Sequence, residues 1–174
     1  EAQVWRLHQP HVLGASLDLA VVAEDPAAAL AAARAARAEI DRLDQVLSRW
    51  RADSLLSRGD TSDELEAVVA AAERWRQATD GAFDARRSGR LDLDGLAKGH
   101  VIDRALIAAR QTRGVDGLML DIGGDLRVWG RSPGGDGWRV GVAAPERLQD
   151  NAEPPEVLRL AEGAVAFSGP GLRG

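Results

Sequence analysis

Apolar residues recur along the first half of the chain with the spacing typical of helices. Ahead of them, residues 13–22 first alternate and then become fully apolar, which predicts a strand. Asp25 provides a helix N-cap, and Pro26 stands at the first helical position. We therefore expect a long amphipathic helix over residues 26–50. Its apolar stripe comprises Leu30, Ala33, Ala36, Ile40, Leu43, Leu47 and Trp50.

Two further helices are predicted from local signals. The first begins at a capping box, with Thr61 as the cap and Glu64 as its partner, and it ends where Gly81 suits the C′ position. Its inward face comprises Leu65, Val68, Val69, Ala72 and Trp75. A short strand end at residues 91–93 then precedes a turn, and the next helix is predicted to follow Gly99 and to end at Arg113-Gly114.

The remainder of the chain alternates with the period of strands. Gly123-Gly124-Asp125 predicts a tight turn, and residues 144–155 predict a loop. The expected strands are 118–122, 126–129, 138–142, 157–160 and 164–167. The helices are predicted in the first part of the chain and a β-meander in the last part. This order favours an α+β fold, with helices packed on an antiparallel sheet. The length of 174 residues fits a single domain over 1–174.

Composition excludes several classes of protein. The net charge of −5 argues against a nucleic-acid or anionic-lipid binder. The chain has no cysteine, so disulfides and cysteine metal sites are excluded, and no apolar run is long enough to cross a bilayer. Lys98 is the single lysine among 22 basic residues. A genome with high GC content explains the excess of arginine, and the lysine left at position 98 is a weak hint that this position needs a compact ammonium group.

Residues 92–99, with the sequence DLDGLAKG, form the segment most suited to chemistry. They precede a predicted helix, whose first N–H groups favour an anion, and glycines let a ligand approach the backbone. Lys98 adds a charge suited to phosphate, while Asp92 and Asp94 suit ribose hydroxyls, an adenine amine or hydrated Mg²⁺. An ordinary strand-to-helix turn with solvated aspartates explains the spacing equally well.

Three other segments have a functional and a structural interpretation. Gly123-Gly124-Asp125 suits either a backbone nest facing a ligand or a plain hairpin turn. Residues 81–84 suit either a contact to a flat ring or a helix C-cap with a core phenylalanine. Trp50 suits either stacking on an aromatic ligand or packing at the helix end. For each of these segments taken alone, the structural interpretation is favoured.

Taken in order, these segments resemble the ApbE family of FAD:protein FMN transferases. The central match is LDLDGLAKGHVIDRA, residues 91–105, against a family pattern of the type DLGGIAKGYAVDRA. Seven blocks in the family's order make the resemblance specific, and it implies an ApbE-like, T-fold-like α+β fold. The other matching blocks are residues 12–16, 47–58, 79–85, 119–130, 136–146 and 164–169.

The resemblance also implies a role for individual positions. Leu13 stands where the family usually has methionine at the flavin pocket, and Trp50 where an aromatic residue covers the isoalloxazine. Asp92 is implied to bind the adenosine part of FAD and Lys98 its phosphates, and the backbone carbonyl of Gly95 is implied to ligate Mg²⁺. The implied FAD-binding set is Leu13, Trp50, Ala82, Phe83, Asp84, Asp92 and Lys98. His100 replaces a common tyrosine, which weakens the case for catalysis there.

The implied reaction is Mg²⁺-dependent transfer of FMN from FAD to a Thr or Ser hydroxyl of an acceptor flavoprotein, with release of AMP. The acceptor would be a subunit of a redox complex, and the location periplasmic or otherwise extracytoplasmic. The alternative is an FAD-binding module or an FAD hydrolase without transfer to protein. The chain contains no identified catalytic base.

The sequence also departs from the family pattern. The stretch between Asp84 and Leu91 is shorter than the family usually has. The histidine-containing segment expected to carry the base is absent, as is the Asp-Ala-x-x-Thr-like segment expected to supply Mg²⁺ ligands. Three explanations account for these departures. The sequence omits parts of a longer protein, it is a fragment, or it is a family member that binds flavin without catalysis. The first is preferred because it gives both gaps one cause.

Overall fold

The computed structural model describes residues 3–87, 89–142 and 156–167. The chain divides into two compact units. Residues 1–35 and 106–174 form the first, here named the sheet unit, and residues 36–105 form the second, the helical unit. The loop predicted at 144–155 lies outside the described residues, as does the end of the matching block at 168–169.

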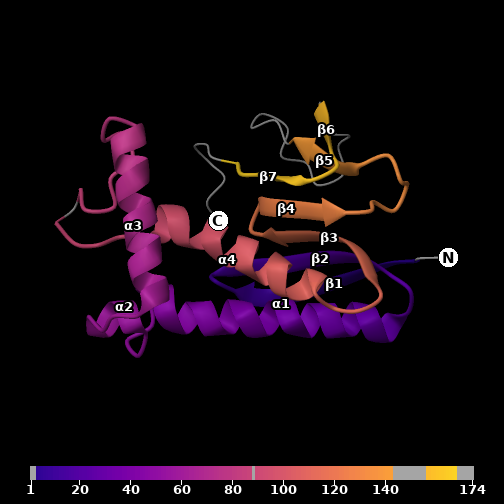
Figure 1. The fold of residues 1–174 in the computed structure, drawn as a ribbon, viewed down its shortest axis with the longest axis horizontal. Coiled ribbons are helices and arrows are strands. Elements are labelled where there is room, and N and C mark those ends of the chain that lie inside the picture. The colour runs from indigo at the N-terminus through magenta and orange to yellow at the C-terminus, as the bar shows by residue number, and fades with distance from the viewer. Residues whose placement is uncertain (1–2, 88, 143–155, 168–174) are drawn as a thin grey trace. The chain divides into compact units, whose positions relative to one another are not determined.

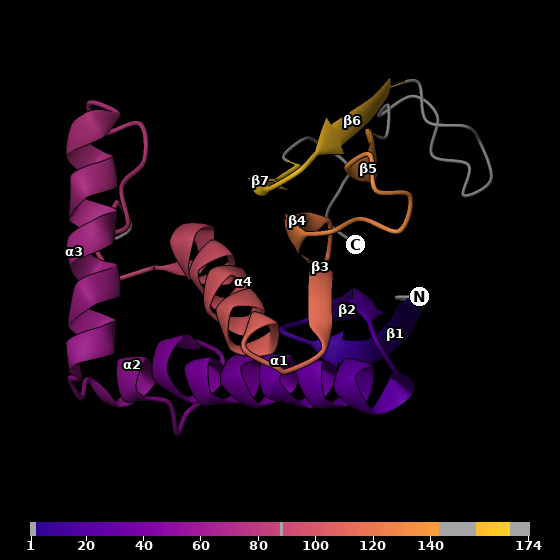
Figure 2. The same cartoon turned by 45° about the vertical axis from the view of Figure 1, so that its right-hand side comes forward.

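The sheet unit is built from antiparallel strands. Five of them are β1 (Gln3–Val12), β2 (Ala15–Ala23), β3 (Val115–Ile122), β4 (Asp125–Gly130) and β7 (Gly163–Val165), and they pair in the order β1-β2-β3-β4-β7 (Figure 1). The strands β5 (Trp138–Val142) and β6 (Glu156–Leu160) form a separate pair, which Figure 2 shows from another side. The predicted α+β class is confirmed, and each predicted strand of the second half is found, although the last one spans Gly163–Val165 rather than 164–167.

Two-residue turns close two hairpins, one between β1 and β2 and the other between β3 and β4. Leu13 and Gly14 join β1 to β2 with φ angles of 52° and 75°, and Gly123 and Gly124 join β3 to β4 with φ angles of 59° and 89°. Positive φ at both central residues defines the type I′ turn, whose twist matches that of the strands. Asp121 strengthens the second turn, because its Oδ1 accepts the N–H of Gly124 at 2.8 Å. The predicted tight turn is confirmed.

Trp138 lies at the centre of one core of the sheet unit, with only 2% of its surface exposed. Alternate positions on β2, β4 and β5 point into this core, as the period of two requires. The buried residues around the indole are Ala20, Val22, Leu126, Val128 and Val140. The strand β1 was not predicted, because it lies at the sheet edge and most of its side chains are exposed.

The first helix, α1, spans Pro26–Leu47 and passes from the sheet unit into the helical unit. Its predicted cap is confirmed, since Asp25 Oδ1 accepts the N–H of Ala28 at 2.8 Å. Most of the predicted stripe is buried, but Leu30 is 44% exposed and Trp50 is 80% exposed. The prediction for Trp50 as a packed helix end is wrong, because the helix ends three residues earlier and Trp50 lies in the following loop.

The helical unit also contains α2 (Leu55–Arg58), α3 (Asp63–Ala78) and the start of α4 (Asp94–Arg110). The cap of α3 is Ser62 rather than Thr61, because Ser62 Oγ accepts the N–H of Leu65 at 3.2 Å. Trp75, predicted to be buried, is 55% exposed. No helix of the described residues has the length and apolar character that a membrane span needs.

The predicted strand end at 91–93 and the predicted helix start after Gly99 are both wrong, because α4 already begins at Asp94. Its first carbonyl, that of Leu93, accepts the N–H of Ala97 at 2.7 Å. Each glycine inside a helix costs about 1 kcal/mol relative to alanine. Burial of Leu93, Ala97 and Val101, one turn apart on a single face, offsets that cost.

Candidate functional site

Seven of the eight positions implied by the sequence to bind FAD or Mg²⁺ lie in the helical unit. Leu13 lies in the sheet unit, on the turn between β1 and β2, with 37% of its surface exposed. The helical unit holds Trp50, Ala82, Phe83, Asp84, Asp92, Gly95 and Lys98. Their binding roles stay predictions, but their geometry shows which of them lie together.

The segment 92–99 forms the start of α4. Asp92 lies two residues before the first residue of α4, and its Oδ1 accepts the N–H of Asp94 at 3.0 Å. Gly95 and the half-buried Lys98 follow on the first two turns. The N-terminus of a helix carries partial positive charge and favours anions. The segment therefore combines this partial positive charge with one lysine and two carboxylates.

Arg49 joins the start of α4 to the loop that carries Trp50. Its Nε donates to Asp94 Oδ2 at 2.6 Å, and its Nη1 lies 3.3 Å from Asp92 Oδ2. Its guanidinium carbon also lies 4.4 Å from the centroid of the Trp50 ring, within the range of a cation–π contact. No signal in the sequence pointed to Arg49 at this site, because its pairs with Asp92 and Asp94 join residues about 45 positions apart.

Residues 79–87 pack against the same helix start. A Cβ added to Gly95 would lie 3.2 Å from Phe83 Cε2, so the absence of a side chain there leaves room for the phenylalanine ring. Thr79 Oγ1 accepts the N–H of Phe83 at 3.0 Å, and the carbonyl of Ala85 accepts the N–H of Asp92 at 2.8 Å. Asp84 instead accepts the nearby N–H of Arg86. Phe83, Gly95 and Asp92 are thus brought together.

An open groove of about 1070 Å³ adjoins this region within the helical unit. Trp50 and Arg49 line it, so the exposed indole borders this groove. Its apolar lining includes Leu56, Leu65, Val69, Ala70 and Leu91. Polar and charged side chains line the rest of the groove, among them Asp60, Glu66, Glu73 and Arg90.

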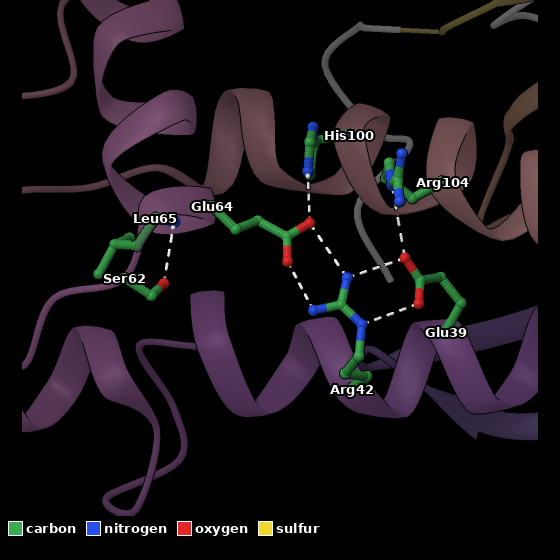
Figure 3. Close-up of polar contacts among 7 residues, drawn as sticks. All are labelled: Glu39, Arg42, Ser62, Glu64, Leu65, His100 and Arg104. Carbon is green, nitrogen blue, oxygen red and sulfur yellow. Dashed lines mark hydrogen bonds and ion pairs between the residues drawn. The ribbon is translucent and has the colours of Figure 1, made fainter.

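A network of charged side chains ties α1, α3 and α4 together inside the helical unit (Figure 3). Arg42 donates to Glu64 at 2.5 and 3.1 Å and to Glu39 through two bonds of 2.8 Å. From α4, His100 Nε2 lies 3.4 Å from Glu64, and Arg104 Nε lies 3.4 Å from Glu39. Through His100 and Arg104, this network holds the part of α4 that begins two residues after Lys98.

Hydrogen bonds from Arg42 hold the pKa values of Glu39 and Glu64 below their ordinary value of 4.5, with burial opposing the shift. Carboxyls with a lowered pKa stabilise the folded state above their unfolded pKa, and this contribution is lost as the pH falls through the folded value. We therefore expect the free energy of unfolding to decline from about pH 5 downward.

Glu64→Gln should make that decline less steep, because glutamine does not titrate. Thermal unfolding from pH 7 to pH 3 measures the slope for the wild type and the variant. Glu66→Gln is the matched control, since Glu66 is an exposed glutamate on the same helix. An identical slope in the Glu64 and Glu66 variants would contradict the role of the network.

Among the described residues, no cluster of side chains is placed to hold a divalent cation by itself. These residues contain no group of three or more His, Cys, Asp or Glu side chains placed to hold a metal ion. Asp92 and Asp94 are already engaged by Arg49. Mg²⁺ usually keeps several waters and takes one or two carboxylates together with substrate phosphates. The carboxylates of this region therefore do not fit Mg²⁺ while Arg49 holds them.

Comparison with known proteins identifies the family. The sequence profile of the ApbE family matches residues 13–89 and 85–173, so it covers most of the chain in two segments that meet at residues 85–89. The chain belongs to the ApbE family. The resemblance stated from the sequence is confirmed.

Individual relatives match more distantly. The FAD:protein FMN transferase of Vibrio cholerae serotype O1 is 30% identical over 79 residues, which are 45% of this chain and 23% of that protein. The flavin transferase ApbE structure from Vibrio cholerae has a TM-score of 0.80 at 20% identity, with 98% of this chain and 72% of that chain covered. The apo flavinyl transferase ApbE of Pseudomonas stutzeri has a TM-score of 0.74 at 21% identity, with 92% and 66% covered. At these identities the structural matches establish the fold.

Proposed function

We propose that the protein transfers FMN from FAD to a threonine or serine hydroxyl of an acceptor flavoprotein and releases AMP. The observation that carries the proposal is the family match, which runs from residue 13 to residue 173. The name of the Vibrio cholerae relative describes this reaction class. The proposed acceptor is a subunit of a redox complex, and the proposed location is extracytoplasmic.

In this proposal the start of α4 receives the diphosphate. The hydroxyl oxygen forms a bond to the FMN-side phosphorus, the bond from that phosphorus to the bridging oxygen breaks, and AMP leaves with that oxygen. Lys98 and the helix N-terminus supply positive potential where charge develops, which is the largest contribution to catalysis in many enzymes. Trp50 and Phe83 provide aromatic surface for the flavin.

Two parts of the reaction are not assigned to residues. The hydroxyl proton passes to a general base as the bond to phosphorus forms. The proposed reaction also requires Mg²⁺. Asp92 and Asp94 are not assigned as its ligands, because both pair with Arg49.

Incubation of the natural protein with FAD, Mg²⁺ and a flavoprotein acceptor tests the proposal. Chromatography measures AMP, and mass spectrometry measures FMN bound to the acceptor, with a chelator and an acceptor lacking the target hydroxyl as controls. We expect AMP and bound FMN in equal amounts. AMP with free FMN would support a hydrolase instead, and bound but uncleaved FAD would support a binding module.

A further inference from the structure

The proposed diphosphate site presents an electrostatic problem. Asp92 and Asp94 lie at the same helix start as Lys98, and their two negative charges oppose a ligand that carries negative charge itself. Asp92 and Asp94 are 41% and 43% exposed, so water screens their charges only in part. Neutralising these carboxylates would therefore favour the binding of FAD at this helix start.

Arg49 meets that requirement. Its side chain contacts both carboxylates and also covers the indole of Trp50, so one guanidinium joins the negative pair to the aromatic ring. The planar fork of an arginine suits this arrangement better than the point charge of a lysine, because it can bond along its edge and stack on its face. Trp50 is 80% exposed, and the contact with Arg49 restricts the position of its ring.

We infer that Arg49 is a positioning residue for FAD: it neutralises Asp92 and Asp94 so that the diphosphate can approach α4, and it holds Trp50 beside the groove. The inference rests on the proposed function. It does not require Arg49 to contact FAD. The side chains of Arg49, Asp92 and Asp94 are 42%, 41% and 43% exposed, so these ion pairs contribute little to stability.

Arg49→Gln in the natural protein is the first test, with FAD affinity measured by titration of flavin fluorescence. We expect affinity about tenfold weaker, an effect of the size that a nearby partly screened charge produces. The loss should shrink at high salt, because screening weakens the repulsion from the uncompensated carboxylates. Arg51→Gln is the matched control, since Arg51 also pairs with two aspartates, but these are Asp44 on α1 and Asp53 in the loop after it.

Charge restoration separates neutralisation from direct contact. Adding Asp94→Asn to Arg49→Gln returns the local charge to its original value, so the double variant should recover most of the lost FAD affinity. Thermal unfolding of each variant checks that the protein is folded.

The inference is overturned if Arg49→Gln binds FAD as tightly as the wild type. It is also overturned if the double variant binds as weakly as Arg49→Gln, because Arg49 would then contact the ligand itself. If the wild type binds no FAD, the proposed function fails and the inference fails with it.

Discussion

Replacing Lys98 with alanine is expected to weaken FAD binding by about 10- to 150-fold. A hydrogen bond to a charged group contributes about 1.5–3 kcal/mol, which corresponds to this range of affinity. Lys98 is half-buried on the second turn of α4, next to the helix N-terminus that favours an anion. Titration with FAD, followed by flavin fluorescence, measures the loss.

Arg110→Ala is the control for Lys98→Ala. It removes one positive charge from the same helix, but about 18 Å further along it at a rise of 1.5 Å per residue. This variant should bind FAD like the wild type. Equal losses in the two variants would show that only net charge matters, and the assignment of Lys98 to the diphosphate would be wrong.

Leu43→Ala should produce the largest loss of stability, about 2–5 kcal/mol of the free energy of unfolding. Leu43 is fully buried on α1, and truncation removes its apolar contacts and leaves a cavity. Urea denaturation, followed by circular dichroism, measures the change.

Leu30→Ala provides a matched comparison on the same helix. Leu30 is 44% exposed, so its truncation should cost well under half as much as that of Leu43, at most about 1 kcal/mol. The sequence pattern placed both leucines in one apolar stripe, whereas the structure separates them. Similar losses in the two variants would contradict that separation.

Elements with strong local signals were predicted well from the sequence. The cap formed by Asp25 and the turn at Gly123-Gly124 depend on neighbouring residues alone, and both are found where predicted. The strand at residues 138–142 has the predicted bounds, because alternate residues face a core. Local chemistry and the period of two carry enough information for such elements.

The candidate site was only partly predictable, because long-range contacts decide its geometry. The start of α4 was not predicted, because Gly95 and Gly99 have a low helix propensity. Burial of neighbouring apolar residues stabilises this part of the helix. Trp50 was predicted to pack at a helix end, yet it lies exposed beside Arg49. The pairing of Arg49 with Asp92 and Asp94 joins two segments that no local pattern connects.

The preference of the protein for FAD over FMN tests most directly whether the start of α4 receives the diphosphate and adenosine of FAD. Parallel titrations of the natural protein with FAD and with FMN give the ratio of the two affinities, and the same titrations are made on Lys98→Ala. We expect FAD to bind at least about tenfold more tightly, since only FAD offers the diphosphate bonds to Lys98, and we expect the ratio to fall toward one in the variant. Equal affinities for FAD and FMN in the wild type, or a ratio that Lys98→Ala leaves unchanged, would contradict this assignment.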